Sequence, residues 1–272
     1  MNTSQESPQY EFGFACDVGR KRKGEPNQDA LDVVLGSPSN WHPPLLIVAD
    51  GLGGHRGGAV ASQLVIQVFR QQFKQTSHPT EYAQLLELCA RKAHMAVQVH
   101  GAQDSNLFNM GSTVVAVVLE EKQLHLLNVG DSRAYLLRGQ RIIQLSEDQS
   151  WVGEQVRAGL LTPQQALKDS RRNRLNMAIT AKRTEIKTYA MEIALEPDDI
   201  ILLCSDGLWG VVPETLIWAA ASELAPQVAA EKLVALANSS KGPDNISVII
   251  AQRIRADRKP ASVNLEDTNP GE

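Results

Sequence analysis

Leu45-Leu-Ile-Val-Ala-Asp50 is a fully apolar run that ends in a carboxylate. Such a run predicts a short strand buried on both faces, because a strand with one wet face alternates apolar and polar residues. The arrangement returns in the strand that precedes Asp131 and in Ile200-Ile-Leu-Leu-Cys204, which is followed by Asp206. A fourth acid, Asp244, opens the last predicted strand. Buried strands therefore deliver aspartates at their ends.

The segments around these strands predict an α+β fold. Residues 10 to 35 form two expected strands around a basic loop, and later stretches show helical periodicity. We expect helices over 57–75, 80–99 and 226–237, a hairpin over 112–119 and 123–129, and strands over 200–204 and 246–251. This order of elements predicts a layered sandwich of mainly antiparallel sheets.

The composition is that of a globular protein. Of the 272 residues, 43% are hydrophobic and 21% are charged, and no repeat or linker divides the chain. We predict a single domain over residues 10–252, with a charged flap subdomain at about 150–183. The tails at 1–9 and 253–272 are predicted to be flexible.

Charge and cysteine content exclude several classes of protein. A net charge of −4 gives no overall attraction to nucleic acid or to an anionic membrane. The three cysteines form no C-x-x-C pair, which argues against a zinc site or a disulfide framework. The polar N-terminus lacks a secretory signal, and no apolar run approaches the roughly 18 residues that span a bilayer. We expect a cytoplasmic protein without a membrane or nucleic-acid partner.

Carboxylates held at the ends of buried strands can converge, and converging carboxylates need cations to neutralise them. No cysteine or histidine cluster accompanies them, so oxygen ligands favour Mg²⁺, Mn²⁺ or Ca²⁺ over zinc or copper. A shared carboxylate favours a pair of ions that would activate a water for attack on phosphorus. The alternative for each acid alone is an ordinary Asp-Gly turn, which is common in proteins.

A series of short motifs runs in order over residues 10 to 252. They are Asp17-Val-Gly-Arg20, Asn27-Gln-Asp29, Val48-Ala-Asp-Gly-Leu-Gly-Gly-His55, Met110-Gly-Ser-Thr113, Val129-Gly-Asp-Ser-Arg-Ala-Tyr135, Leu145-Ser-Glu-Asp-Gln-Ser150, Cys204-Ser-Asp-Gly-Leu-Trp-Gly210 and Pro243-Asp-Asn-Ile-Ser247. Taken together they resemble the metal-dependent protein phosphatases, in the bacterial form of the type 2C serine/threonine phosphatases.

The resemblance implies a four-layer α-β-β-α sandwich, in which helix pairs flank two antiparallel sheets and a metal cleft lies at one end. It also implies removal of phosphate from serine or threonine residues of proteins, in signalling opposite a serine/threonine kinase. The implied cofactors are two Mn²⁺ or Mg²⁺ ions, with a third in some bacterial members. We expect the enzyme to act on phosphorylated proteins as a monomer.

Carried over residue by residue, the resemblance assigns Asp50 as the bridge between both ions and the Gly51 carbonyl as a ligand of one. Asp206 and Asp244 would bind the other ion. Asp131, paired with Asp206, matches the position of the weaker third ion, although a hairpin aspartate bonded to its own turn is the alternative.

Three further assignments concern the reaction itself. Asp29 looks like an outer-shell acid that holds metal-bound water. Arg22 or Arg20 would hold the substrate phosphate, as a guanidinium can do bidentately, and we favour Arg22 because it lies nearer Asp29. The alternative for both is a solvated basic loop. His55 is a candidate general acid, although it does not follow the Asp-Gly pair directly as in eukaryotic relatives.

Two segments depart from the family pattern. Gln28 stands where the family has an acid, and Ala181-Lys-Arg-Thr-Glu185 replaces its customary Arg-Ala-Leu-Gly. We hypothesise that the flap arginines, Arg171, Arg172 and Arg174, select the phosphoprotein partner. Two rival functions are a pseudophosphatase scaffold that only binds and an enzyme for small phosphorylated metabolites.

Overall fold

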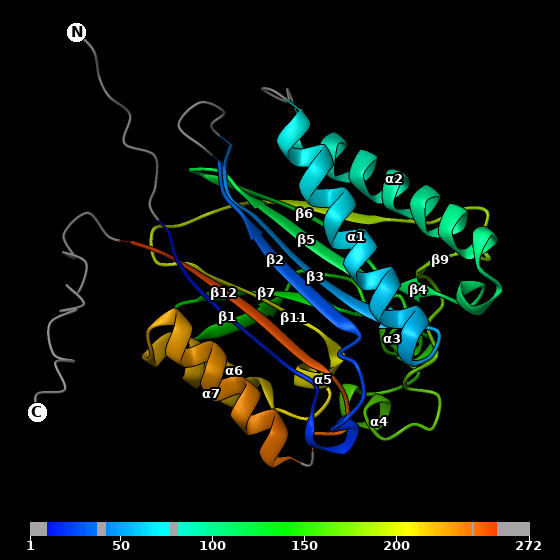
Figure 1. Ribbon diagram of the computed structural model, residues 1–272. Coiled ribbons are helices and arrows are strands. Elements are labelled where there is room, and N and C mark those ends of the chain that lie inside the picture. Colours follow the sequence, from blue (N-terminus) through cyan, green and yellow to red (C-terminus); the bar gives the residue numbers. More distant parts are fainter. Residues whose placement is uncertain (1–9, 37–41, 77–80, 241, 255–272) are drawn as a thin grey trace, which may run out of the picture.

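The structure is a computed structural model that describes residues 10–36, 42–76, 81–240 and 242–254. The predicted tails, 1–9 and 253–272, fall outside these ranges except for residues 253 and 254. The division of the chain into one domain with a flap therefore stays a prediction. Four layers make up the fold, two sheets inside and a helix pair on each outer side (Figure 1).

The larger sheet has seven strands in the order β10-β6-β5-β3-β4-β9, and β2 pairs with β3. Its strands are β2 (Asp29–Val34), β3 (Leu45–Leu52), β4 (Gly111–Ser112), β5 (Val114–Leu119), β6 (Gln123–Val129), β9 (Ile179–Thr180) and β10 (Tyr189–Ala194). The five-stranded sheet has the order β1-β12-β11-β7-β8. It contains β1 (Tyr10–Asp17), β7 (Arg133–Arg138), β8 (Arg141–Gln144), β11 (Ile200–Cys204) and β12 (Ile246–Arg253). All strand pairs are antiparallel.

The apolar run of residues 45–49 in β3 is buried on both faces, as predicted. Leu45, Ile47 and Ala49 pack into the core under one helix layer. Leu46 and Val48 point the other way, into the core between the two sheets. A run that faced water on one side would expose every second residue, so the unbroken apolar run belongs to a strand with a layer on each side.

Helices cover the outer face of each sheet. The seven-stranded sheet carries α1 (His55–Gln75) and α2 (Tyr82–Gln103), and the five-stranded sheet carries α6 (Glu214–Glu223) and α7 (Pro226–Ser239). Figure 1 shows α1 and α2 above one sheet and α6 and α7 below the other. The predicted α+β four-layer architecture is confirmed.

Several boundaries differ from the predictions, and some elements were not predicted. Helix α1 begins two residues before the expected residue 57, directly after Gly53 and Gly54, whose φ angles of 105° and 85° end the strand and turn the chain. The last strand continues to Arg253. The sequence reasoning missed β8, β10, α6 and the short helices α3 (Trp151–Arg157) and α5 (Asp206–Trp209), because their apolar patterns are short or mixed.

The segment predicted as a flap holds α3, α4 (Pro163–Ala166) and β9. Helix α4 begins with a capping box, in which the Thr162 side chain accepts a hydrogen bond from the Gln165 amide and the Gln165 side chain accepts one from the Thr162 amide. Two 3-10 turns complete the described elements, η1 (Arg20–Arg22) after β1 and η2 (Ser105–Leu107) after α2. Among the described residues, no helix combines the length and apolarity needed to cross a bilayer.

The close packing of α7 on β1 gives a test of the fold. A Cβ atom added to Gly13 in β1 would lie 2.0 Å from the Pro226 carbonyl carbon, which is backbone and cannot rotate away. We expect Gly13→Ala to lower the free energy of unfolding by about 1–3 kcal/mol or more, measured by urea denaturation. Gly57→Ala is the control, because its nearest neighbour lies 3.5 Å away and alanine favours a helix. Equal stability of the two variants would contradict this packing.

Candidate active site

Five aspartates lie at one shared end of the two sheets. Asp29 opens β2 and pairs in register with Asp50, near the end of β3. Asp206 follows β11, Asp131 precedes β7 and Asp244 precedes β12. Since neighbouring antiparallel strands alternately end and begin at the same edge, all five acids come to one place.

The acids of the two sheets touch each other. Asp206 shares a side-chain hydrogen bond with Asp50, so a carboxyl from each sheet meets in the middle of the site. Asp29 and Asp131 are buried, whereas Asp50 and Asp206 keep a partly exposed edge. The structure therefore brings together all five acids that the sequence singled out.

Burial and mutual repulsion raise the pKa of these acids. Burial first, and then the charges of Asp29 and Asp206, raise the pKa of Asp50 well above its usual range. Burial raises the pKa of Asp29 to about 7, against the hydrogen bond that it accepts from Ser205. Burial and Asp244 raise the pKa of Asp206 to about 6. Burial followed by the charge of Asp206 raises the pKa of Asp131 well above its usual range.

Within the described part of the chain, two buried carboxylate oxygens of the cluster have no hydrogen-bond partner, the Oδ1 atoms of Asp29 and Asp206. Buried polar atoms are normally paired, so such oxygens mark a place for a donor or a cation. No three of the described Asp, Glu, His and Cys side chains surround a single point as a finished cage. A hard cation such as Mg²⁺ needs only one or two carboxylates because it keeps several waters, and the all-oxygen donor set suits it.

Side chains between the two sheets hold the acids in place. The Thr113 hydroxyl accepts a hydrogen bond from the Asp50 amide at 3.0 Å and contacts the Ser132 hydroxyl of the other sheet at 2.7 Å. Ser205 donates to Asp29 Oδ2 at 2.7 Å across the sheets. The sequence reasoning quoted these hydroxyl residues in motifs but gave them no role. Polar residues at the ends of otherwise apolar strands were the signal that could have found them.

The two candidate phosphate-binding arginines are separated by the structure. Arg22 reaches into the site, where its Nη2 atom lies 2.9 Å from Asp244 Oδ1 and Oδ2. Arg20 is exposed, and it is not among the residues that line the cavity beside the acids. Its backbone amide donates to Asn238 Oδ1. The geometry thus favours Arg22 over Arg20.

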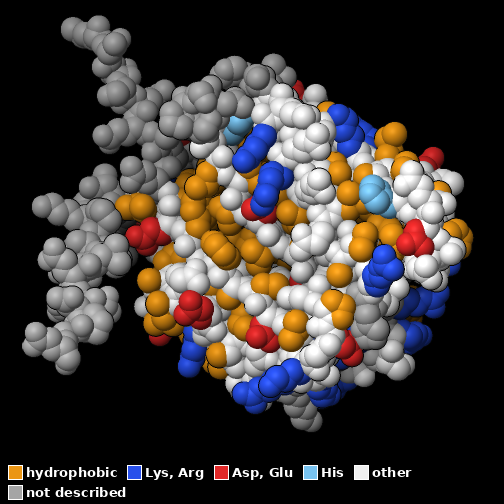
Figure 2. Space-filling view, in the orientation of Figure 1, with side chains coloured by type: hydrophobic (Ala, Val, Ile, Leu, Met, Phe, Trp, Pro, Cys, Tyr) orange, Lys and Arg blue, Asp and Glu red, His pale blue; other side chains and the backbone are white. Residues whose placement is uncertain are grey.

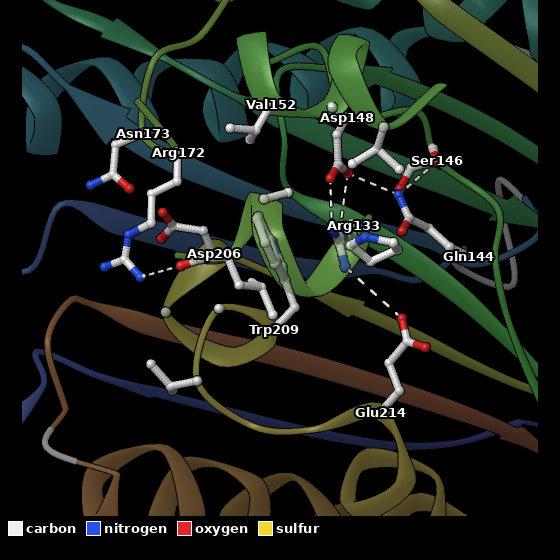
Figure 3. A pocket seen from close by; sticks show the side chains of 18 of the residues that line it. Arg133, Gln144, Ser146, Asp148, Val152, Arg172, Asn173, Asp206, Trp209 and Glu214 are labelled. Atoms are coloured by element: carbon white, nitrogen blue, oxygen red, sulfur yellow. Dashed lines mark hydrogen bonds and ion pairs between the residues drawn. The ribbon is translucent and has the colours of Figure 1, made fainter. Parts of the chain in front are cut away.

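The three flap arginines also have different surroundings. Figure 3 shows the Arg172 guanidinium pointing at Asp206, and its positive charge lowers the pKa of that acid against the larger effect of burial. Arg171 instead binds Asp169 and lies over the Trp151 ring, 3.5 Å from its centre. Arg174 is exposed. The sequence reasoning placed all three in partner selection and missed the proximity of Arg172 to the acids.

A cavity of about 970 Å³ extends from the acids between the flap and the body. Arg22, Asp206 and Asp244 line its inner end, whereas much of its remaining wall is apolar, including Val152, Val156, Leu167, Met191 and Val212. Trp209 also lines the cavity and stands between Asp206 and Arg133 (Figure 3). A phosphorylated side chain could enter at the acids while the chain around it lies along the apolar wall.

Comparison with known proteins agrees with this geometry. Residues 18–239 match the model of the protein phosphatase 2C family. The chain belongs to the protein phosphatase 2C family. The predicted resemblance and the predicted class of enzyme, a protein phosphatase, are thereby confirmed.

One sequence comparison and two structural comparisons illustrate the similarity. The serine/threonine phosphatase stp of Listeria monocytogenes serotype 4b is 34% identical over 88% of this chain and 94% of its own length. The crystal structure of the Mycobacterium tuberculosis phosphatase PstP superposes with a TM-score of 0.79 at 30% identity, covering 89% of this chain and 98% of that one. The catalytic domain of PstP in complex with two manganese ions gives a TM-score of 0.77 at 30% identity, covering 90% and 99%.

Gln28, the first departure from the family pattern, is buried in this phosphatase. Its backbone amide donates to Asn245 Oδ1 at 2.9 Å, and its backbone carbonyl accepts from the Gly51 amide at 3.1 Å. The Gln28 side-chain oxygen would lie 2.4 Å from a Cβ atom built on Gly58, so the side chain packs against the start of α1. Gln28 therefore supports the strand that carries Asp50. The other departure, residues 181–185, lies beside α2, where His94 and Gln98 bond the Arg183 carbonyl.

The raised pKa values make cation binding to this phosphatase depend on pH. Asp29 and Asp206 hold protons up to pH values of about 7 and 6, above the unfolded value of 3.8, so without a cation their contribution to stability is greatest in acid. That contribution is lost as the pH rises through 6 to 7. A cation replaces the protons, so we expect Mn²⁺ to raise the Tm more at pH 8 than at pH 5.5.

Differential scanning fluorimetry measures this effect, and each kcal/mol of extra stabilisation corresponds to roughly 2–4 °C. Asp50→Asn is the control, because it removes the central acid and should show little Mn²⁺ shift at either pH. Equal shifts of the unmodified protein at both pH values would contradict the link between these acids and the cation.

Proposed function

We propose that this phosphatase hydrolyses phosphoserine and phosphothreonine in other proteins, with two Mn²⁺ or Mg²⁺ ions held at the acid cluster. The observation that carries the proposal is the meeting of Asp50 and Asp206 between the sheets, with buried carboxylate oxygens left over. Carboxylates this close are compatible with a stable charged site only beside cations. PstP, a relative with the same fold, was solved with two manganese ions.

In this proposal Asp50 would be shared by the two ions, and the Gly51 carbonyl would be a ligand of one of them. Asp206 and Asp244 would hold the other. When bound, the ions supply a water of lowered pKa and neutralise charge on the phosphoryl oxygens. Asp131 supports a third, weaker ion, since its buried side chain lies close enough to Asp206 for their charges to interact.

The remaining roles belong to side chains around the acids. Asp29 is fixed by Ser205 through one oxygen, and its free Oδ1 accepts a hydrogen bond from a water and so orients it. Arg22 holds the substrate phosphate, and Arg172 stands close enough to assist. His55 begins α1 as the candidate general acid for the leaving serine oxygen, and its side chain lies outside the described part of the structure.

The relatives support a protein substrate over a small metabolite. Both stp and PstP are named serine/threonine phosphatases, which act on side chains of proteins. The cavity of about 970 Å³ has room for residues beside the phosphorylated one. We therefore place a phosphorylated polypeptide in this cleft, and we propose that the enzyme acts in the cytoplasm, as a monomer, opposite a serine/threonine kinase.

Hydrolysis of a phosphothreonine peptide and of an aryl phosphate tests the proposal. We expect activity with Mn²⁺ or Mg²⁺ that disappears in EDTA, and a fall of at least about a hundredfold in kcat for Asp50→Asn and Asp206→Asn. Circular dichroism would verify that both variants fold. A folded protein that hydrolyses neither substrate with any ion would overturn the proposal in favour of a scaffold that only binds.

The choice between Arg22 and Arg20 has its own test. Losing a charge-assisted contact to phosphate costs about 1.5–3 kcal/mol, so Arg22→Ala should lower kcat/KM for the aryl phosphate by roughly 10- to 100-fold. Arg20→Ala is the matched control and should change it less than about twofold, because an exposed charge outside the cavity contributes little. A larger loss from Arg20→Ala than from Arg22→Ala would reverse the assignment.

A further inference from the structure

The turn that carries Arg22 contains four consecutive cations, Arg20-Lys-Arg-Lys23. Arg22 is the member that lines the cavity and binds Asp244. Arg20, Lys21 and Lys23 are exposed, and within the described residues their charged groups have no hydrogen-bond or ion-pair partner. We call these three residues the basic lip.

The backbone of the basic lip is fixed relative to the acids. The Lys21 amide donates to the Gly242 carbonyl at 3.0 Å, and the Arg20 amide donates to Asn238 Oδ1 at 3.1 Å. Gly19 packs so closely on the Asp244 carbonyl that an added Cβ atom would lie 2.0 Å from it. The lip is thus held against the loop that carries Asp244.

The unpaired charges of the lip contrast with several arginines elsewhere in the protein. Arg70, Arg133 and Arg138 each bind an aspartate at 2.6 Å. The whole chain carries a net charge of −4, so the lip is a local concentration of positive charge on an acidic protein. Figure 2 shows Lys and Arg side chains along the lower edge of the molecule, where η1 lies in Figure 1.

Two guanidinium groups stand beside the lip where the phosphate would enter. Arg22 and Arg172 line that end of the cavity, together with Asp206 and Asp244, which the proposed cations would neutralise. The acids Asp148 and Glu214 lie beyond Trp209, on the other side from Asp206 (Figure 3), and Asp148 is paired with Arg133. A polypeptide whose phosphate reaches Arg22 therefore passes cations next, since an extended chain advances only about 3.3–3.6 Å per residue.

We propose that the basic lip selects protein segments with additional negative charge next to the phosphorylated residue. The charge is carried by Asp, Glu or a second phosphorylated residue. This inference rests on the proposed phosphatase function and names its preferred substrate class. Exposed ion pairs contribute roughly 1.5- to 5-fold each, and a fixed cluster of cations also attracts an anionic segment over a distance.

The test compares phosphothreonine peptides that share one core and carry Glu, Gln or Lys on both sides, and one peptide with a second phosphothreonine. For the unmodified enzyme at low salt we expect kcat/KM to be about fivefold higher with Glu than with Gln flanks, and lowest with Lys flanks. The doubly phosphorylated peptide should match or exceed the Glu peptide. Raising the salt to about 0.5 M should reduce the preference.

The variant Lys21→Gln with Lys23→Gln should reduce the Glu preference to about twofold or less, while hydrolysis of the aryl phosphate stays unchanged. The matched control is Lys122→Gln with Lys232→Gln, which makes the same change in net charge. Lys122 is exposed in the β5–β6 turn, at the opposite end of the sheet from the acids, and Lys232 is exposed on α7. This control should keep the full preference.

A uniform rate on all flanks would overturn the inference. A Glu preference that survives in the lip variant would also overturn it. If that variant in addition loses binding to anionic phospholipid vesicles, the lip is assigned to a lipid surface. Peptide binding to Asp50→Asn protein, by fluorescence anisotropy, tests the same preference without catalysis. Absence of aryl phosphate hydrolysis then counts against the proposed function alone.

Discussion

Repulsion among five buried or half-buried carboxylates is the constraint around which this fold is arranged. Each acid sits where a strand begins or ends, and burial keeps water from screening its charge. Without compensation the cluster would push the two sheets apart at that end. Protons compensate it in acid, the guanidinium groups of Arg22 and Arg172 compensate part of it, and divalent cations complete the compensation in the proposed function.

The sheets can carry this charge because polar side chains join them at the same end. Thr113 contacts Ser132, Ser205 donates to Asp29, and Asn245 accepts from the Gln28 amide, so each of these contacts crosses from one sheet to the other. Towards the other end, apolar side chains of the cluster that includes Leu46 and Val48 fill the interface, and Arg138 donates to the Ala194 carbonyl of the opposite sheet at 2.8 Å. A folded core thus supplies the stability, and the polar bridges set the positions of the acids.

The sequence predicted the acids better than it predicted the elements around them. Asp50 and Asp206 follow unbroken apolar runs, and such runs have few structural interpretations, so both the strands and their ends were correct. Strand β10 was missed because its alternating residues include Glu192 and its outer side is exposed, which is a weak pattern at the edge of a sheet. The proximity of Arg172 to Asp206 was not predicted, because a charged stretch usually lies on the surface and only the tertiary structure turns this side chain toward the acid.

The flap can present Arg172 to the acids because its base is tied to the same strand end that carries Asp131. Arg133, two residues after Asp131, binds Asp148 with two hydrogen bonds of 2.9 and 2.6 Å, and its guanidinium lies 3.7 Å from the centre of the Trp209 ring. The Trp209 indole in turn donates to the Asp131 carbonyl at 3.0 Å. A polypeptide lying over Trp209 would therefore contact a ring that donates to the Asp131 carbonyl and stacks on the Arg133 guanidinium. Recognition along the apolar wall and the geometry of the acids thus depend on the same few contacts.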